Sequence, residues 1–198
     1  MRLLVTAAGW AALTVLVVPA AAEPIRFSTD TFQIIGGMGN GAPQARRGNY
    51  RGKEIVDFAT PQAPGTIIIR TGERKLYYVL ADGRAIQYGI GVGREGFTWS
   101  GSDKITRKAK WPDWRPPKEM IDREQQRGNY IPAHMVGGPE NPLGARALYI
   151  GDTMYRIHGT NQPWSIGLAV SSGCIRMLNE EVIDLYNRVE PGAQVVVE

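Results

Sequence analysis

The sequence predicts a mainly β protein, a sandwich or barrel of short strands with one or two short helices. Three observations carry this prediction. Short β-branched segments recur between Gly and Pro residues. Asp82-Gly83 and Gly151-Asp152 are tight-turn signals that separate pairs of such segments. Only two segments, residues 117–126 and 179–189, have helical character.

The first 22 residues have the pattern of a signal peptide. Arg2 precedes an apolar stretch from about Leu3 to Val18, and Ala20 and Ala22 form an A-x-A site. We therefore expect export and cleavage after Ala22. The alternative is an uncleaved membrane anchor, but the apolar stretch is shorter than the roughly 20 residues of a spanning helix. No stable membrane span is expected after cleavage.

Residues 23–53 are rich in Gly, Asn and Arg without a hydrophobic period, which predicts a flexible linker before a single domain at 54–198. The chain has 23 Lys and Arg against 19 Asp and Glu, a net charge of +4. This mild excess favours an anionic polymer such as a cell wall over an acidic partner. The sequence has no basic helix and no aromatic residues interleaved with cations, so we expect no nucleic-acid partner.

The strands are expected in the following order. Thr66–Arg70 is a β-branched run, and Lys75–Leu80 follows after a Thr-Gly-Glu turn. Residues 84–92 return across the Asp82-Gly83 hairpin. Lys104–Lys110 reads as a polar, exposed strand, and residues 147–150 and 154–157 flank the second hairpin. Ala193–Val197 is the last strand.

Two helices are expected among these strands. The segment 117–126 is short and polar. The segment 179–189 is clearer, because Val182, Leu185, Tyr186 and Val189 follow the spacing of one buried face. Asn179 is its expected N-cap, with acidic residues in the first turn.

The stretch from Trp111 to Gly144 is rich in Pro, Gly and Trp and has little regular pattern. A long irregular excursion inside a compact β domain is usually a functional loop. We expect a lid in which Trp114 meets substrate. The alternative is a structural plug at the end of the sandwich.

Cys174 is the single cysteine of the chain, which in an exported protein means a bridge to another molecule, a free thiol or an inert buried residue. A nucleophilic thiol needs a base, and the chain holds two histidines, His134 and His158. His158 is expected at the end of a strand, 16 residues before Cys174. It would take the thiol proton and hold a thiolate ion pair with a lowered thiol pKa. Amides around Gly173 would face an oxyanion. His134 lies in the excursion and is the weaker candidate.

Two other interpretations compete with this one. A zinc site built from the cysteine and both histidines lacks the paired-ligand spacing of structural zinc sites. Alternatively, His158 is a structural histidine in a domain that only binds a polymer.

His158-Gly159-Thr160-Asn161 and the segment from Ser171 to Met177, SSGCIRM, resemble the signature of the L,D-transpeptidase (YkuD-like) catalytic domain. The blocks "YGIGVGREGFTWSG", "ITRKAKWPDWRPP", "GGPENPLGARALYI" and "DLYNRV" also look like family blocks in the family order. The resemblance covers about residues 55–198. It implies a β sandwich of mixed sheets with one or two short helices and a lid-like loop, needing no metal or other cofactor.

The resemblance also implies roles for residues and a partner. Cys174 would be the nucleophile and His158 the base, oriented by the Gly159 carbonyl, with the Gly173 and Cys174 amides as oxyanion hole. The substrate would be peptidoglycan stem peptides in the periplasm or envelope, and the acceptor amine would come from a second stem, an envelope protein or a free D-amino acid. The expected substrate-contacting residues are Arg176, Ser171, Ser172 and Trp114. Many members have His where this chain has Ser172, which leaves His158 as the base. A non-catalytic wall-binding domain of the same fold is the rival interpretation.

Overall fold

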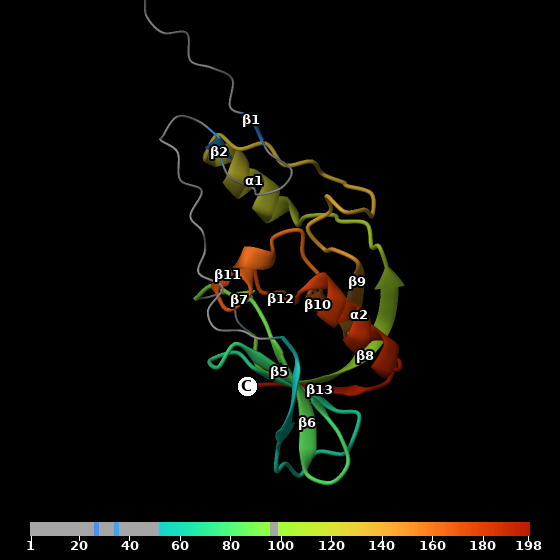
Figure 1. Ribbon diagram of the computed structural model, residues 1–198. Helices are drawn as coiled ribbons and strands as arrows, with labels where there is room; N and C mark the ends of the chain where they lie inside the picture. The colour runs from blue at the N-terminus through green and yellow to red at the C-terminus, as the bar shows by residue number, and fades with distance from the viewer. Residues whose placement is uncertain (1–25, 28–33, 36–51, 96–98) are drawn as a thin grey trace, which may run out of the picture.

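The computed structural model describes residues 26–27, 34–35, 52–95 and 99–198, and the predicted signal peptide and most of the predicted linker lie outside these ranges. Its main feature is a nine-stranded mixed sheet in the order β12-β10-β9-β8-β13-β4-β5-β6-β3 (Figure 1). These strands are β3 (Glu54–Asp57), β4 (Ile67–Arg70), β5 (Lys75–Val79), β6 (Arg84–Gly89), β8 (Gly101–Lys110), β9 (Arg146–Ile150), β10 (Arg156–His158), β12 (Ile175–Arg176) and β13 (Gln194–Val197). Two short pairs accompany it, β1 (Arg26–Phe27) with β2 (Ile34–Ile35), and β7 (Val92–Gly93) with β11 (Ala169–Ser171).

The centre of the sheet is buried on both faces. In β4, Ile67 and Ile69 pack into the main core, while Ile68 points to a smaller cluster around Phe58 and Tyr77. The parallel strand β13 repeats this arrangement. Since successive side chains of a strand face opposite sides, an uninterrupted run of β-branched residues is what a doubly covered central strand requires.

Strand β8 joins the two halves of the sheet. Its first residues pair with β13 and its second half pairs with β9, with a register shift between Ile105 and Arg107. A bulge of this kind lets one strand change sheets at a corner. The sheet therefore folds over one core, to which both halves contribute side chains such as Leu76 and Leu148. The predicted mixed β sandwich is confirmed, with the two layers continuous through β8.

Most predicted strands are found within a residue or two of their expected ends. The Asp82-Gly83 hairpin has positive φ at both residues, 60° and 66°, as a two-residue hairpin turn requires. The predicted strand 84–92 is divided, because the amide and carbonyl of Gly91 bond to Arg176 and take the chain out of β6. The short strands β11 and β12 were not expected from the sequence.

Helix α2 (Asn179–Arg188) covers the core with Val182 and Leu185. Asn179 was predicted as its N-cap, and this is wrong. Leu178 is the N-cap residue and makes no side-chain capping bond. Asn179 is the first helical residue, and its side chain bonds to other segments near the candidate site.

The excursion 111–144 contains helix α1 (Lys118–Gln126) and lies at the end of the molecule opposite the β5–β6 hairpin (Figure 1). It has a small core of its own, in which Trp114, Ile131 and Leu143 are buried. Its base is closed where the Trp111 amide donates to the Ala145 carbonyl at 2.9 Å. Among the described residues, no helix has the length and apolar character needed to cross a membrane.

Candidate active site

The lone cysteine follows a tight loop between β11 and β12. Ser171 Oγ donates to the Cys174 carbonyl at 2.7 Å and accepts from the Gly173 amide at 3.2 Å. Gly173 has φ 112°, a conformation that residues with a Cβ rarely adopt. The serine and the glycine of the Ser-Ser-Gly-Cys segment therefore shape the loop that presents the thiol.

The pairing of β10 with β12 brings the cysteine and the histidine to one face. The strands are parallel, with Ile157 opposite Ile175 and His158 opposite Arg176. Both isoleucines point into the main core. Because side chains alternate along a strand, His158 and Arg176 lie on the other face, and so do Arg156 and Cys174. Cys174, directly before β12, and His158, at the end of β10, thus lie diagonally across the strand pair, each beside an arginine.

The His158 ring is oriented by burial and by a main-chain hydrogen bond. Its side chain is 4% exposed, and Nδ1 bonds to the Gly159 carbonyl at 2.5 Å, which leaves Nε2 as the basic nitrogen when Nδ1 carries the proton. The following residue is clamped by Asn179, whose Oδ1 accepts from the Thr160 amide at 3.2 Å and whose Nδ2 donates to the Thr160 carbonyl at 3.0 Å. The glycine of the His-Gly pair is needed here, since a Cβ on Gly159 would clash with Asn179 Oδ1.

The same asparagine also ties down the end of the excursion. Asn179 Oδ1 accepts from the Ala145 amide at 3.0 Å, and a Cβ on Gly144 would again clash with this oxygen. One side chain at the start of α2 therefore fixes both the loop after His158 and the base of the excursion.

The pKa shifts of Cys174 and His158 contradict the predicted thiolate–imidazolium ion pair. Burial, and then the charge of Arg176, lower the pKa of His158 to about 3. Burial raises the pKa of the Cys174 thiol, although the charges of Arg156 and Arg176 oppose this. The expected thiolate–imidazolium ion pair with a lowered thiol pKa is therefore wrong for this structure. Burial disfavours both charges, and the two guanidinium groups disfavour the imidazolium further. The pair rests as neutral thiol and neutral imidazole, and the thiol donates weakly to the Met154 carbonyl at 3.8 Å.

The pair opens into a cleft of about 600 Å³. One wall is the excursion, including Trp114, which is 7% exposed. The predicted residues that line the cleft are Trp114, His158, Ser171, Ser172, Cys174 and Arg176. His134 is not among the lining residues, because it bonds to Asp113 at 2.9 Å on the exposed side of the excursion. Within the described ranges, no three His, Cys, Asp or Glu side chains gather in a way that would hold a metal ion.

Two predicted roles change with this geometry. One of the two amides expected to bind the oxyanion, that of Gly173, already donates to Ser171 Oγ. Arg176 lines the cleft and also donates to Gln162 Oε1 at 3.0 Å, so it braces the wall while facing the site.

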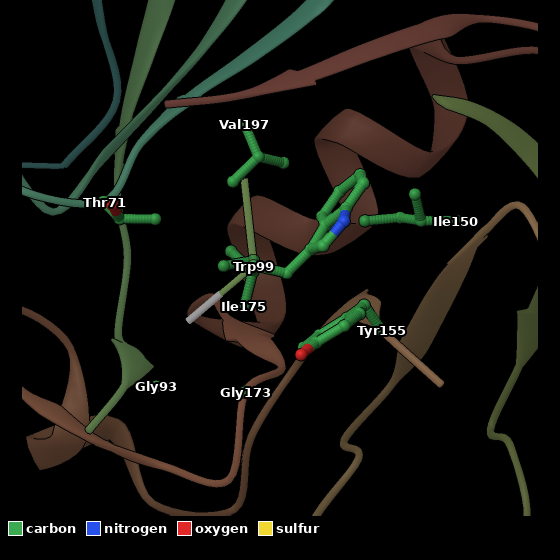
Figure 2. Close-up of a pocket in the computed structure, with 8 residues that line it drawn as sticks. All are labelled: Thr71, Gly93, Trp99, Ile150, Tyr155, Gly173, Ile175 and Val197. Atoms are coloured by element: carbon green, nitrogen blue, oxygen red, sulfur yellow. The ribbon is translucent and has the colours of Figure 1, made fainter. Parts of the chain in front are cut away.

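The back of the catalytic loop is packed by aromatic rings. The rings of Trp99 and Tyr155 stack with centroids 5.7 Å apart. They border a cavity of about 10 Å³ that reaches Gly173 and Ile175 (Figure 2). This space is at the lower limit for one water molecule. Tyr155 also lines the large cleft, so its ring borders both hollows.

Sequence reasoning missed Arg156 and Asn179. The signal for Arg156 was present, because a residue two positions before His158 in a strand shares its face. Asn179 carried no such signal, since its partners at 145 and 160 are distant in the chain.

Comparison with known proteins agrees with this geometry. A family model described as the L,D-transpeptidase catalytic domain matches residues 64–197. The chain belongs to the L,D-transpeptidase catalytic domain family. This L,D-transpeptidase domain is 36% identical over 136 residues to the probable L,D-transpeptidase ErfK/SrfK of Escherichia coli, covering 66% of this chain and 43% of that protein. It is 39% identical over 134 residues to the probable L,D-transpeptidase YbiS of the same organism, covering 65% and 43%.

The chain thus spans less than half the length of these two curated relatives. Among solved structures, an L,D-transpeptidase from Mycobacterium smegmatis superimposes with a TM-score of 0.52 at 17% identity, over 69% of this chain and 59% of that one. At this identity the superposition establishes a shared fold. The L,D-transpeptidase domain therefore combines the family's sequence pattern with its architecture.

Proposed function

We propose that this protein is a cysteine L,D-transpeptidase that acts on peptidoglycan stem peptides through an acyl-enzyme on Cys174. The observation that carries the proposal is the placement of His158, at the end of β10, and Cys174, directly before the parallel strand β12, on one face at the cleft. A histidine oriented by a main-chain carbonyl beside a thiol at the cleft is the arrangement that nucleophilic catalysis requires.

The first half-reaction is acyl transfer to sulfur. The thiol proton passes to His158 Nε2 while Sγ attacks the carbonyl carbon of the diamino acid at position three of the stem. Because both groups rest neutral, charge separation begins only as the C–S bond forms. The C–N bond to the terminal D-alanine then breaks, the nitrogen takes the proton back from His158, and D-alanine leaves.

The second half-reaction returns the thiol. A free amine attacks the thioester carbon, His158 takes one proton from the amine, and the C–S bond breaks as the thiolate receives this proton. The product is a new amide bond. The acceptor amine belongs to a second stem, an envelope protein or a free D-amino acid, and water as nucleophile would give hydrolysis.

Charged groups beside the thiol support a substrate that carries carboxylates. Arg156 and Arg176 flank Cys174, and the guanidinium of Arg176 is positioned by Gln162. Arginine forks bind carboxylates well in partly desolvated sites. The Cys174 amide is the main oxyanion donor of this proposal, since the Gly173 amide has Ser171 as partner. Ser172 and Trp114 contribute walls.

Export to the periplasm or cell envelope belongs to the same proposal. Its support is the signal-peptide pattern of residues 1–22 and the location of peptidoglycan outside the inner membrane. The linker at 23–53 would tether the domain or give it reach.

The rival function is a wall-binding domain without catalysis. Mass spectrometry after incubation with a carbapenem separates the two, because a carbapenem acylates a competent nucleophilic cysteine of this family. We expect one adduct, located on Cys174. An intact protein without adduct would favour the binding module.

Substitution of the two central residues tests their roles. Cys174→Ser is expected to abolish turnover while the fold is retained, since a hydroxyl is a far weaker nucleophile in a site built for sulfur. His158→Ala should cost about as much, and the double variant about the same as either, because residues that act as a unit are not additive. A double variant far below both single variants would contradict the dyad.

A further inference from the structure

A second hollow lies on the outer side of β8 and β9, next to the base of the excursion. It has a volume of about 480 Å³. We call it the outer groove. Its aromatic lining is Trp111 and Tyr149, and its charged lining is Arg107, Lys110, Asp113, Arg115 and Arg156. Four of these side chains are cations and one is an acid, so the outer groove has an excess of positive charge.

The single acid is already engaged. Asp113 bonds through Oδ2 to His134 Nε2 at 2.9 Å, and its Oδ1 accepts from the Gly137 amide at 3.1 Å. Within the described residues, none of the four cations forms a salt bridge. Asp113 interacts electrostatically with Arg115 and offsets only part of the positive charge, so an anionic ligand would find complementary charge here.

Two of the cations are held in place by one aromatic ring. The Arg107 guanidinium carbon lies 3.5 Å from the centroid of the Tyr149 ring, and that of Arg156 lies 5.5 Å from it. Stacking on a ring restricts a guanidinium while leaving its N–H edges available to hydrogen-bond acceptors. The Nε of Arg156 is buried without a hydrogen-bond partner, which is costly unless a ligand supplies one.

The outer groove meets the catalytic cleft at Arg156. This residue lines both hollows. It also stands beside Cys174, since its neighbour Ile157 pairs with Ile175. A ligand held by Arg107 and Arg156 would therefore end next to the thioester.

We propose that the outer groove binds the carboxylates of the acceptor, an acidic peptide, and directs its amine toward Cys174. This rests on the transpeptidase function proposed above and adds the acceptor's chemical class. The donor stem occupies the cleft under the excursion and forms the thioester. The acceptor amine then attacks the thioester carbon from the side of Arg156, with the proton and the C–S bond handled as in the second half-reaction.

The test compares two acceptors and two variants. The acceptors are a diamino-acid-containing stem peptide with free carboxylates and the same peptide with its carboxyl groups amidated. The variants are Arg107→Gln with Lys110→Gln in the outer groove, and Lys104→Gln as control. Lys104 is exposed on the same strand outside the groove. Acylation of Cys174 by donor alone, aminolysis of the acyl-enzyme, and calorimetric binding of the acidic peptide are measured.

We expect the double variant to acylate normally and to lose roughly tenfold in aminolysis by the acidic acceptor, with no loss for the amidated one. The control should match the unmodified protein. In the unmodified protein, the preference for the acidic acceptor should shrink as salt rises from about 0.05 to 0.5 M, because screening weakens exposed charge contacts.

Equal use of both acceptors by the unmodified protein would overturn the proposal, and so would an equal loss for both acceptors in the double variant. The binding measurement needs no turnover, so it separates failure of this proposal from failure of the transpeptidase function. An acylation-deficient protein that still binds the acidic peptide through Arg107 and Lys110 would refute catalysis and keep the anion site. The salt series uses the unmodified chain, so a variant that fails to fold does not remove the test.

Discussion

At the scale of single residues, the site depends on the burial of groups that ionise. His158 is covered on every side except toward the cleft, and two arginines stand near it. The same burial that keeps the imidazole neutral also makes its protonation unfavourable for the folded chain.

This predicts acid sensitivity that originates from one residue. The pKa of His158 falls from 6.5 to about 3 on folding, so below pH 6.5 the unfolded chain binds a proton that the folded chain does not. The stability is present above pH 6.5 and is lost as the pH falls toward 3, by up to roughly 5 kcal/mol. Urea unfolding of the protein and of His158→Gln, compared between pH 6.5 and 4, measures it. If the free energy of unfolding fell equally in both proteins between pH 6.5 and 4, the acid sensitivity would belong to other groups.

At the scale of elements, α2 and the excursion control the cleft from outside the catalytic strands. Asn179 connects them, because it bonds to the loop after His158 and to Ala145 at the end of the excursion. The excursion in turn supplies a wall of the cleft through Trp114.

We predict that Asn179→Ala slows acylation of Cys174 by at least about tenfold, because the Gly159 carbonyl that orients His158 loses its support. The loss of three hydrogen bonds should also lower the free energy of unfolding by roughly 1–3 kcal/mol. Asn179→Asp keeps the acceptor oxygen and should recover part of the rate. Imidazole nitrogen shifts measured by NMR should change in the Ala variant. Unchanged shifts with a slow enzyme would argue against a role through His158.

Trp114→Ala should destabilise the excursion more than the rest of the domain. The indole belongs to a cluster separate from the main core, and it lines the cleft. Acylation should fall about tenfold or more, while the main melting transition moves by only a few degrees. Trp114→Phe keeps apolar bulk and should be nearly normal in melting. A large fall in melting temperature with normal acylation of the folded protein would show that Trp114 is a structural plug.

At the scale of the whole molecule, β8 pairs with strands of both halves of the sheet, so we expect the two halves to unfold as one cooperative unit. Ile105, fully buried at the register shift, contacts the core that both halves share. Removing the Ile105 side chain would reduce the packing at the corner where the sheet folds over its core.

Ile105→Ala should therefore lower the free energy of unfolding by roughly 2–5 kcal/mol. Tryptophan fluorescence and far-UV circular dichroism should still report one coincident transition. The matched control is Ile55→Ala, whose side chain is 64% exposed, and a change within about 0.5 kcal/mol is expected there. Two separated transitions would mean that the halves unfold independently.

Local structure and the residues that carry the chemistry could be predicted from the sequence pattern. Turn signals such as Asp82-Gly83, the β-branched runs of β4 and β13, and the apolar face of α2 depend on neighbours within a few residues, so pattern reveals them. The lone cysteine and the His-Gly pair were evident for the same reason, and the family prediction that they supported is confirmed.

How these parts meet depends on contacts between segments that are distant in the chain. The neutral resting state of Cys174 and His158 follows from burial by segments distant in the chain, and a sequence pattern contains no measure of desolvation. The use of Asn179 as a clamp in place of a helix cap, and the position of Arg156 between two hollows, depend on strand register and on non-local contacts. Register and burial are set by the packing of the whole chain, which is why they appear only when the sheet has folded over its core.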